Sequence, residues 1–169
     1  MEGNGERQRG LGLISCDTNI LLHACNARSP LQSLAEAFMR EHAEDAEFAI
    51  CELVLIELYV LLRNPAVVAN PLSASRAAET IRGYRGNPRW RIIDYPGGLM
   101  EKIWQMAGQP DTGRRSIFDA RLALTLRHHG VSRFATGNVK HFGGYGFEKV
   151  WNPLSAESGE PRKKTDIRQ

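Results

Sequence analysis

The chain has 169 residues, 42% hydrophobic and 24% charged, which is ordinary for one globular domain and excludes a disordered or disulfide-stapled chain. Its formal net charge of +3, from 22 Lys and Arg against 19 Asp and Glu, is too small to identify a nucleic-acid partner by itself. Without an apolar run of about 18 residues or a secretory signal, and with three cysteines outside any CxxC motif, we expect a cytoplasmic protein that makes no membrane contact.

Strand-like runs alternate with helical patterns along most of the chain. Short apolar runs predict strands at residues 11–16, 48–51, 90–95, 131–136 and 148–151. Apolar residues at helical spacing predict helices near residues 20–24, 31–42, 53–63, 73–84, 99–107 and 117–129. This alternation predicts an α/β fold with a mostly parallel sheet and helices on both of its faces.

The two ends of the chain differ from the part between them. Residues 1–10 are polar and glycine-rich, and residues 155–169 are polar and charged, and neither shows a period. We therefore predict flexible tails at 1–10 and 155–169 around one domain at 11–154.

Two acidic residues stand at informative positions in the predicted elements. Asp17 directly follows the first strand, and open α/β sheets bind ligands beyond the carboxyl ends of their strands. Glu57 lies between Ile56 and Leu58 in an apolar helix, where a buried carboxylate is costly unless it is paired or binds a metal. A place on the polar face of that helix would explain Glu57 equally well.

Two later residues have a structural and a functional interpretation. Asp119 follows Ser116 by three positions, as in a capping box, but it also shares a helical stripe with Leu122 and so points toward the protein. Asn138 follows the strand at 131–136, where it either completes a turn with Gly137 or faces the same crevice as Asp17.

Carboxylates brought to one site repel each other unless a divalent cation neutralises them. Hard oxygen ligands suit Mg²⁺ or Mn²⁺, and such ions activate water for attack on phosphodiesters. Arg114 and Arg115 precede the helix of Asp119, where they either bind phosphates or form a solvated basic loop.

At this point the sequence resembles the PIN-domain ribonucleases, over about residues 11–154. Its Asp17-Thr-Asn19, the segment around Glu57, Ile117-Phe-Asp119 and the segment Ala135-Thr-Gly-Asn-Val-Lys-His-Phe142 are similar to the four motifs of that family, in order. The ending Val150-Trp-Asn-Pro-Leu154 is similar to that of the VapC-type toxins within the family.

The resemblance implies a three-layer α/β/α fold and Mg²⁺- or Mn²⁺-dependent cleavage of RNA. It further implies a homodimer that a cognate antitoxin protein holds inactive. The metal ligands would be Asp17, Glu57 and Asp119, with Asn138 as a further catalytic residue. The expected supporting and substrate-binding residues are Thr18, Asn19, Arg114, Arg115 and Thr136.

The fourth motif departs from the pattern of many relatives, which have an aspartate at the position of Asn138 or His141. The neutral Asn138 adds no charge, so a second metal ion is less expected than the activity itself. His141 could be a base, a phosphate contact or a solvated loop residue.

Two other functions are compatible with parts of the pattern. A PIN-like module could bind RNA or an antitoxin without cutting. A phosphotransferase could use Asp17 as a nucleophile, but Asn19 stands where such enzymes have a second aspartate.

Overall fold

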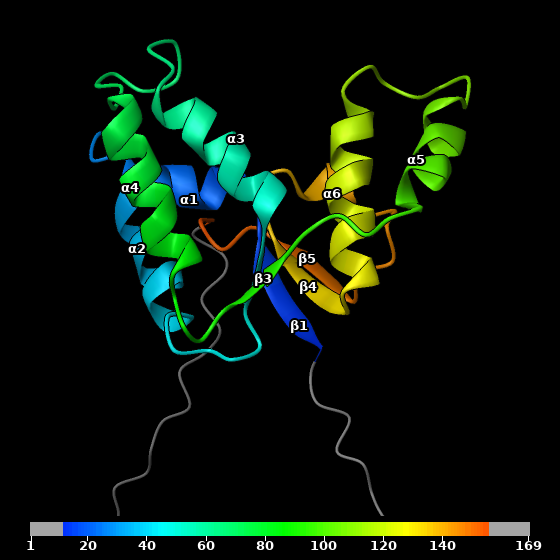
Figure 1. Ribbon diagram of the computed structural model, residues 1–169, viewed down its shortest axis with the longest axis horizontal. Coiled ribbons are helices and arrows are strands. Elements are labelled where there is room, and N and C mark those ends of the chain that lie inside the picture. The colour runs from blue at the N-terminus through cyan, green and yellow to red at the C-terminus, as the bar shows by residue number, and fades with distance from the viewer. Residues whose placement is uncertain (1–11, 156–169) are drawn as a thin grey trace, which may run out of the picture.

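The computed structural model describes residues 12–155, so the tail predicted at 1–10 and all but the first residue of the tail predicted at 155–169 lie outside the described residues (Figure 1). The strands are β1 (Leu13–Cys16), β2 (Ala49–Cys51), β3 (Arg91–Ile93), β4 (Val131–Ala135) and β5 (Lys149–Trp151). All five predicted strands are thus present, each within two residues of the expected bounds.

The strands run parallel, in the spatial order β3-β2-β1-β4-β5. β1 pairs with β4, β4 with β5, and β2 with β3, all in parallel. A parallel bridge between Ile14 and Phe48, together with a 2.9 Å hydrogen bond from Ile14 N to Glu47 O, brings β2 beside β1. The chain therefore places β2 and β3 on one side of β1, and then β4 and β5 on its other side. This reversal makes a topological switch point between β1 and β4, which is where open α/β sheets bind ligands.

Seven helices surround this sheet in the described part of the chain. They are α1 (Thr18–Cys25), α2 (Gln32–Glu41), α3 (Glu52–Leu62), α4 (Ala74–Arg85), α5 (Leu99–Ala107), α6 (Ser116–His128) and α7 (Val139–Phe142). Figure 1 shows α1 to α4 grouped on one side of the sheet and α5 and α6 on the other. The α/β class and the layered architecture predicted from the sequence are thereby confirmed.

Local sequence signals explain where several helices begin and end. Ser73 caps α4 by accepting a hydrogen bond from Arg76 N, as expected. Gly130, with φ +83°, turns the chain between α6 and β4, a conformation that L residues with a side chain rarely adopt. The helix predicted near residues 31–42 begins at Gln32, with Leu31 as its cap and no side-chain hydrogen bond there. The short helix α7 was not predicted.

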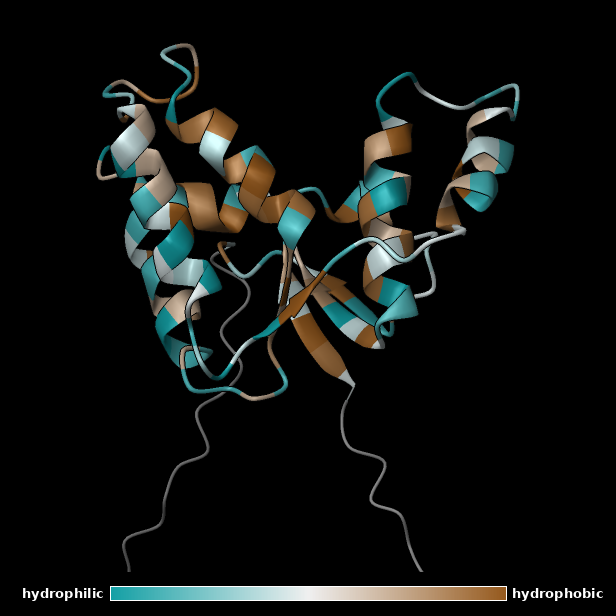
Figure 2. Ribbon diagram, viewed as in Figure 1, coloured by the Kyte–Doolittle hydropathy of each residue, from teal (hydrophilic) through white to brown (hydrophobic). Residues whose placement is uncertain are grey.

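The core forms between the sheet and both helix groups. β1 and β2 are buried along their whole length, and Phe48, Phe134 and Leu126 are among the largest fully buried side chains. Figure 2 colours most of α3 brown, which reflects the many apolar residues in this helix. Among residues 12–155, no helix has both the length and the apolarity needed to span a membrane.

Candidate active site

Asp17 lies at the carboxyl end of β1 and is only 7% exposed. Its Oδ1 accepts a 2.8 Å hydrogen bond from Thr18 N, as the cap of α1. Its Oδ2 accepts from Asn19 Nδ2 at 2.8 Å and from Thr136 Oγ1 at 2.6 Å. Three donors therefore fix a buried carboxylate at the switch point, as the strand-end argument predicted.

Thr136 holds the corresponding place at the end of β4, and it is fully buried. Its hydroxyl donates to Asp17 and accepts from Asn138 N at 3.0 Å and, more weakly, from Asn19 Nδ2 at 3.4 Å. Asn19 Oδ1 in turn accepts from Gly137 N at 3.0 Å. The first and fourth motifs are thus joined by one hydrogen-bond network, to which Asn138 contributes its backbone N–H.

Glu57 reaches the same network from α3. Thr18 Oγ1 donates a 2.6 Å hydrogen bond to Glu57 Oε2, and Thr18 itself is 2% exposed. Glu57 is exposed, so of the two interpretations that the sequence left open the buried one does not apply. The helix carries apolar residues on its exposed side as well, and this is why apolar neighbours did not indicate burial.

Asp119 lies in the first turn of α6, and its side chain is 33% exposed. The cap of α6 is Arg115, without a side-chain hydrogen bond, and Ser116 is already helical. A capping box therefore does not explain Asp119. Its Oδ2 lies 3.3 Å from Nδ1 of His141, whose side chain is 62% exposed. His141 is thus a solvent-exposed residue of α7 that also contacts a predicted site residue.

The charges of Glu57 and Asp119 act on Asp17. Burial raises the pKa of Asp17, and the negative charges of Glu57 and Asp119 raise it further. The hydrogen bonds from Thr136 and Thr18 act in the opposite direction and stabilise the carboxylate, but the net pKa remains above its usual value. Nearby positive charge would therefore favour the ionised form of Asp17.

The donor set fits a small, hard cation that keeps water ligands. Within residues 12–155, no three acidic, histidine or cysteine side chains already form a closed metal site. Mg²⁺ is commonly held by one or two carboxylates together with waters, so a closed protein cage is not required. A carboxylate has about four lone-pair positions, and the three hydrogen bonds to Asp17 leave it capacity for a ligand.

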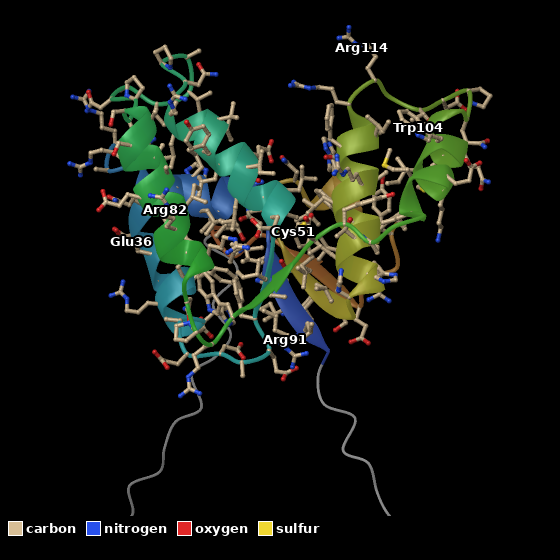
Figure 3. All side chains as sticks on the ribbon, viewed as in Figure 1. Glu36, Cys51, Arg82, Arg91, Trp104 and Arg114 are labelled. Carbon is tan, nitrogen blue, oxygen red and sulfur yellow. The ribbon has the colours of Figure 1, made fainter. Side chains whose placement is uncertain are left out.

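A cavity of about 380 Å³ opens beside Asp119. Its lining includes Arg114, Arg115, Ser116, His141 and Tyr145. Figure 3 shows Arg114 extending from the loop between α5 and α6, away from the sheet. Both arginines are exposed, and neither forms an ion pair with another described residue. The sequence analysis identified the two arginines as candidate site residues but not Tyr145. Tyr145 follows two glycines, in a segment whose apolar residues show neither helical nor strand spacing.

The arginine-rich stretch before and within β3 is less available to a ligand than its composition suggests. Arg85 pairs with Glu52 at 2.5 Å, and Arg89 pairs with Glu44 at 3.2 Å. Arg91 also pairs with a glutamate, Glu47, at 3.2 Å. These ion pairs tie separate segments of the described fold together.

The network and the cavity draw together residues from all four motifs. Asp17, Thr18, Asn19, Glu57, Thr136 and the backbone of Asn138 form one connected group, and Asp119, Arg114 and Arg115 line the adjacent cavity. The exposed side chain of Asn138 makes no hydrogen bond to another described residue.

Comparison with known proteins identifies relatives of the whole fold. No protein-family profile matches the chain. The chain is 49% identical to Ribonuclease VapC24 of Mycobacterium tuberculosis over 145 residues, which are 86% of this chain and 99% of the relative.

Solved structures show the same fold at lower identity. The Mycobacterium tuberculosis toxin VapC20, described as cleaving the sarcin–ricin loop, matches with a TM-score of 0.56 and 21% identity over 72% of this chain and 86% of that one. A chain of FitAB bound to a DNA fragment matches with a TM-score of 0.58 and 16% identity over 88% of this chain and 100% of that one. From the identity to VapC24 and this shared fold, the chain belongs to the VapC family of PIN-domain ribonucleases.

Proposed function

We propose that this VapC-family protein is an endoribonuclease toxin that hydrolyses RNA at the site around Asp17, using a divalent cation. The observation that carries the proposal is the buried Asp17 carboxylate at the switch point, fixed by three donors and acted on by the charges of Glu57 and Asp119. The name of VapC24, a ribonuclease, supports RNA as the substrate.

Asp17, Glu57 and Asp119 are the residues that would hold the cation. When bound, Mg²⁺ or Mn²⁺ supplies positive charge for the phosphate and makes water a better nucleophile. Thr18, Asn19 and Thr136 orient the carboxylates, because each donates to Asp17 or Glu57. The neutral Asn138 supports Thr136 through its backbone and brings no further negative charge.

Arg114 and Arg115 would hold the RNA backbone beside this centre. Both line the cavity that Asp119 also lines, and a guanidinium can donate two parallel hydrogen bonds to a phosphate. Because the proposed substrate is cellular RNA, we propose that the protein acts in the cytoplasm.

The direct test is incubation of the purified full chain with total cellular RNA, in Mg²⁺, in Mn²⁺ and in EDTA. Asp17→Asn is the test variant, and Asp94→Asn is its matched control. Asp94 also follows a strand and accepts from the next backbone N–H, Tyr95 N, at 2.7 Å, but it is exposed and outside the network. We expect discrete fragments that need the metal, vanish in Asp17→Asn and persist in Asp94→Asn.

The same experiment separates the enzyme from a non-catalytic binding module. A folded wild-type chain that binds RNA and cuts none with either metal would support the binding module. Equal cleavage by Asp17→Asn would overturn the site assignment while leaving the ribonuclease activity in place.

Two protein partners complete the proposal, a second copy of the chain and a cognate antitoxin. A dimer is supported by α3, where Ile56 and Val60 are 61% and 57% exposed and lie one helical turn apart. Water-exposed aliphatic side chains at this spacing favour contact with another protein surface. Co-expression with the product of the neighbouring gene should yield a complex in which RNA cleavage is suppressed.

A further inference from the structure

The cavity beside Asp119 adjoins a second hollow, and Tyr145 lies where the two meet. The larger cavity, about 380 Å³, has charged and polar residues in its wall. The smaller one, about 160 Å³, includes apolar side chains such as Met106 and Ile117. Three residues, Gly113, Ser116 and Tyr145, line both. Asp111 and Thr112 also line the smaller cavity, whereas the two arginines and Asp119 line only the larger one.

Tyr145 is held against the core rather than free to swing. Its ring lies 6.2 Å from that of Phe142, centroid to centroid, and Phe142 is 2% exposed. Phe142 packs edge-on against the buried ring of Phe134 at 4.8 Å. Gly146, with φ +78°, turns the chain directly after Tyr145. A half-buried ring fixed on one side loses little conformational entropy when a second ring stacks on it.

Tyr145 is also close to the acidic centre. Partial burial and, to a smaller extent, the negative charge of Asp119 raise the pKa of the Tyr145 phenol, so it stays protonated. Its hydroxyl has no hydrogen-bond partner among residues 12–155. An occupant of the cavity would thus meet an aromatic ring, a neutral hydroxyl and two free guanidinium groups within reach of Asp119.

An unpaired nucleotide has the matching chemistry. Its base offers a flat aromatic face for the ring, and its phosphates suit Arg114 and Arg115. An acidic peptide would satisfy the arginines but would bring a carboxylate toward Asp119 and give the ring nothing to stack on. Proteins that read single-stranded RNA stack splayed bases on aromatic side chains in this manner.

We propose that Tyr145 is the stacking platform for one unpaired RNA base beside the cleaved phosphate, with Arg114 and Arg115 on the adjoining backbone phosphates. The inference rests on the proposed ribonuclease function and specifies single-stranded RNA as its substrate. Tyr145 is then a substrate-binding residue that places the RNA relative to Asp119.

The test measures binding without cleavage. The full chain in EDTA is titrated into a short, fluorescently labelled single-stranded RNA of mixed sequence, and anisotropy is followed at several salt concentrations. Tyr145→Phe keeps the ring, and Tyr145→Leu keeps apolar bulk without it. Tyr59→Leu is the matched control, because Tyr59 is another partly buried tyrosine whose hydroxyl pairs with Arg63 on α3, outside the cavity.

We expect Tyr145→Leu to weaken binding by about tenfold or more, the loss that one base stack represents, and Tyr145→Phe and Tyr59→Leu to bind like the wild type. The slope of log Kd against log salt should be unchanged in Tyr145→Leu. In Arg114→Ala or Arg115→Ala, the slope should fall by about 0.7 for each RNA phosphate that the variant no longer neutralises.

The outcomes separate this inference from the proposed function. If the wild type binds and cuts RNA and Tyr145→Leu binds equally well, the inference alone is wrong. If Tyr145→Phe is as weak as Tyr145→Leu, the hydroxyl and not the ring is responsible, and stacking is overturned. If Tyr145→Leu leaves RNA binding intact but releases the antitoxin, the cavity is a protein site. A wild type that neither binds nor cuts RNA would overturn the proposed function and this inference together.

A second experiment uses the wild-type chain, so its result does not depend on whether Tyr145→Leu folds. Single-stranded RNA carrying 5-iodouridine forms photo-crosslinks to stacked aromatic side chains, and mass spectrometry locates them. We expect a crosslink at Tyr145 in the full chain in EDTA. Crosslinks confined to other residues would overturn the stacking role.

Discussion

The hydroxyl of Thr136 donates a 2.6 Å hydrogen bond to Oδ2 of Asp17, which joins the carboxyl ends of β4 and β1 at the switch point of the sheet. The same hydroxyl oxygen accepts from Asn138 N. Thr136 thus connects the predicted catalytic carboxylate to the start of α7, the helix that carries His141.

Thr136→Val should lower RNA cleavage about tenfold to a hundredfold, because it misplaces Asp17 while preserving the size of the side chain. It should also destabilise the fold by about 1–3 kcal/mol, because the N–H of Asn138 would lose its acceptor and the Asp17 carboxylate would lose one of its three donors. Cleavage assays and urea denaturation measure the two effects.

Thr125→Val is the matched control for the removal of a buried threonine hydroxyl. Thr125 is also a buried threonine, but its hydroxyl donates within α6, to Arg121 O at 2.7 Å. Because Arg121 O still accepts the backbone N–H of Thr125 within α6, we expect little change in stability and unchanged cleavage. If cleavage by both variants fell in proportion to stability, Thr136 would have no role beyond folding.

Thr18→Val should impair cleavage about tenfold or more, whereas Thr18→Ser should remain close to the wild type. The hydroxyl of Thr18 is the contact that orients Glu57 from α1, and a hydrogen bond to a charged group is worth about 1.5–3 kcal/mol. Cleavage rates at saturating RNA, with melting temperatures as a check on folding, distinguish the hydroxyl from the methyl group. Equal impairment in Ser and Val would assign the effect to packing.

Much of this site follows from where residues fall relative to the strands. Asp17 and Thr136 could be placed together from sequence because parallel strands deliver their carboxyl ends to one edge of the sheet. The hydrogen bond from Thr18 to Glu57 could not, since it joins residues 39 positions apart and depends on how α1 packs on α3. The apolar pattern of α3 could not decide whether Glu57 is buried, because Ile56 and Val60 of the same helix are exposed.

The other failures have equally local causes. The helix α7 spans four residues, too few for an apolar period to be visible. Tyr145 follows two glycines, and its place in the cavity depends on contact with Phe142 across a turn. The contact between His141 and Asp119 likewise arises only when α7 meets the first turn of α6.

A divalent cation should stabilise the folded wild type and not Asp17→Asn. At a concentration 100 times its Kd, a bound ligand adds about 2.7 kcal/mol to the free energy of unfolding, which for a chain of this size raises Tm by roughly 5–10 °C. Thermal denaturation in Mn²⁺ or Mg²⁺ against EDTA measures the shift. Asp94→Asn should respond like the wild type, and an identical shift in Asp17→Asn would remove Asp17 from the metal ligands.

The contribution of Asp17 to the stability of the fold should depend on pH in opposite directions with and without the metal. The folded-state pKa of Asp17 is raised, so in EDTA its contribution to stability is present at low pH and is lost as the pH rises through that pKa. A cation requires the ionised carboxylate, so the stabilisation by metal should instead grow as the pH rises. The difference in Tm between wild type and Asp17→Asn isolates this contribution from the other carboxylates.

Ile56→Asp combined with Val60→Asp should convert a dimer into a monomer, as judged by sedimentation velocity at micromolar protein. In a dimer, the two new carboxylates would lie in an apolar contact between the copies and would lose their water. The free energy needed to bury these unpaired charges exceeds the free energy that the apolar contact contributes. Leu34→Asp is the matched control, because Leu34 is also an exposed aliphatic residue, 45% exposed, but on α2.

A dimer that survives the α3 substitutions and dissociates with Leu34→Asp would place the contact on α2. A wild type that is already monomeric would leave the exposed face of α3 to the antitoxin, and the same double variant should then fail to bind the co-expressed partner.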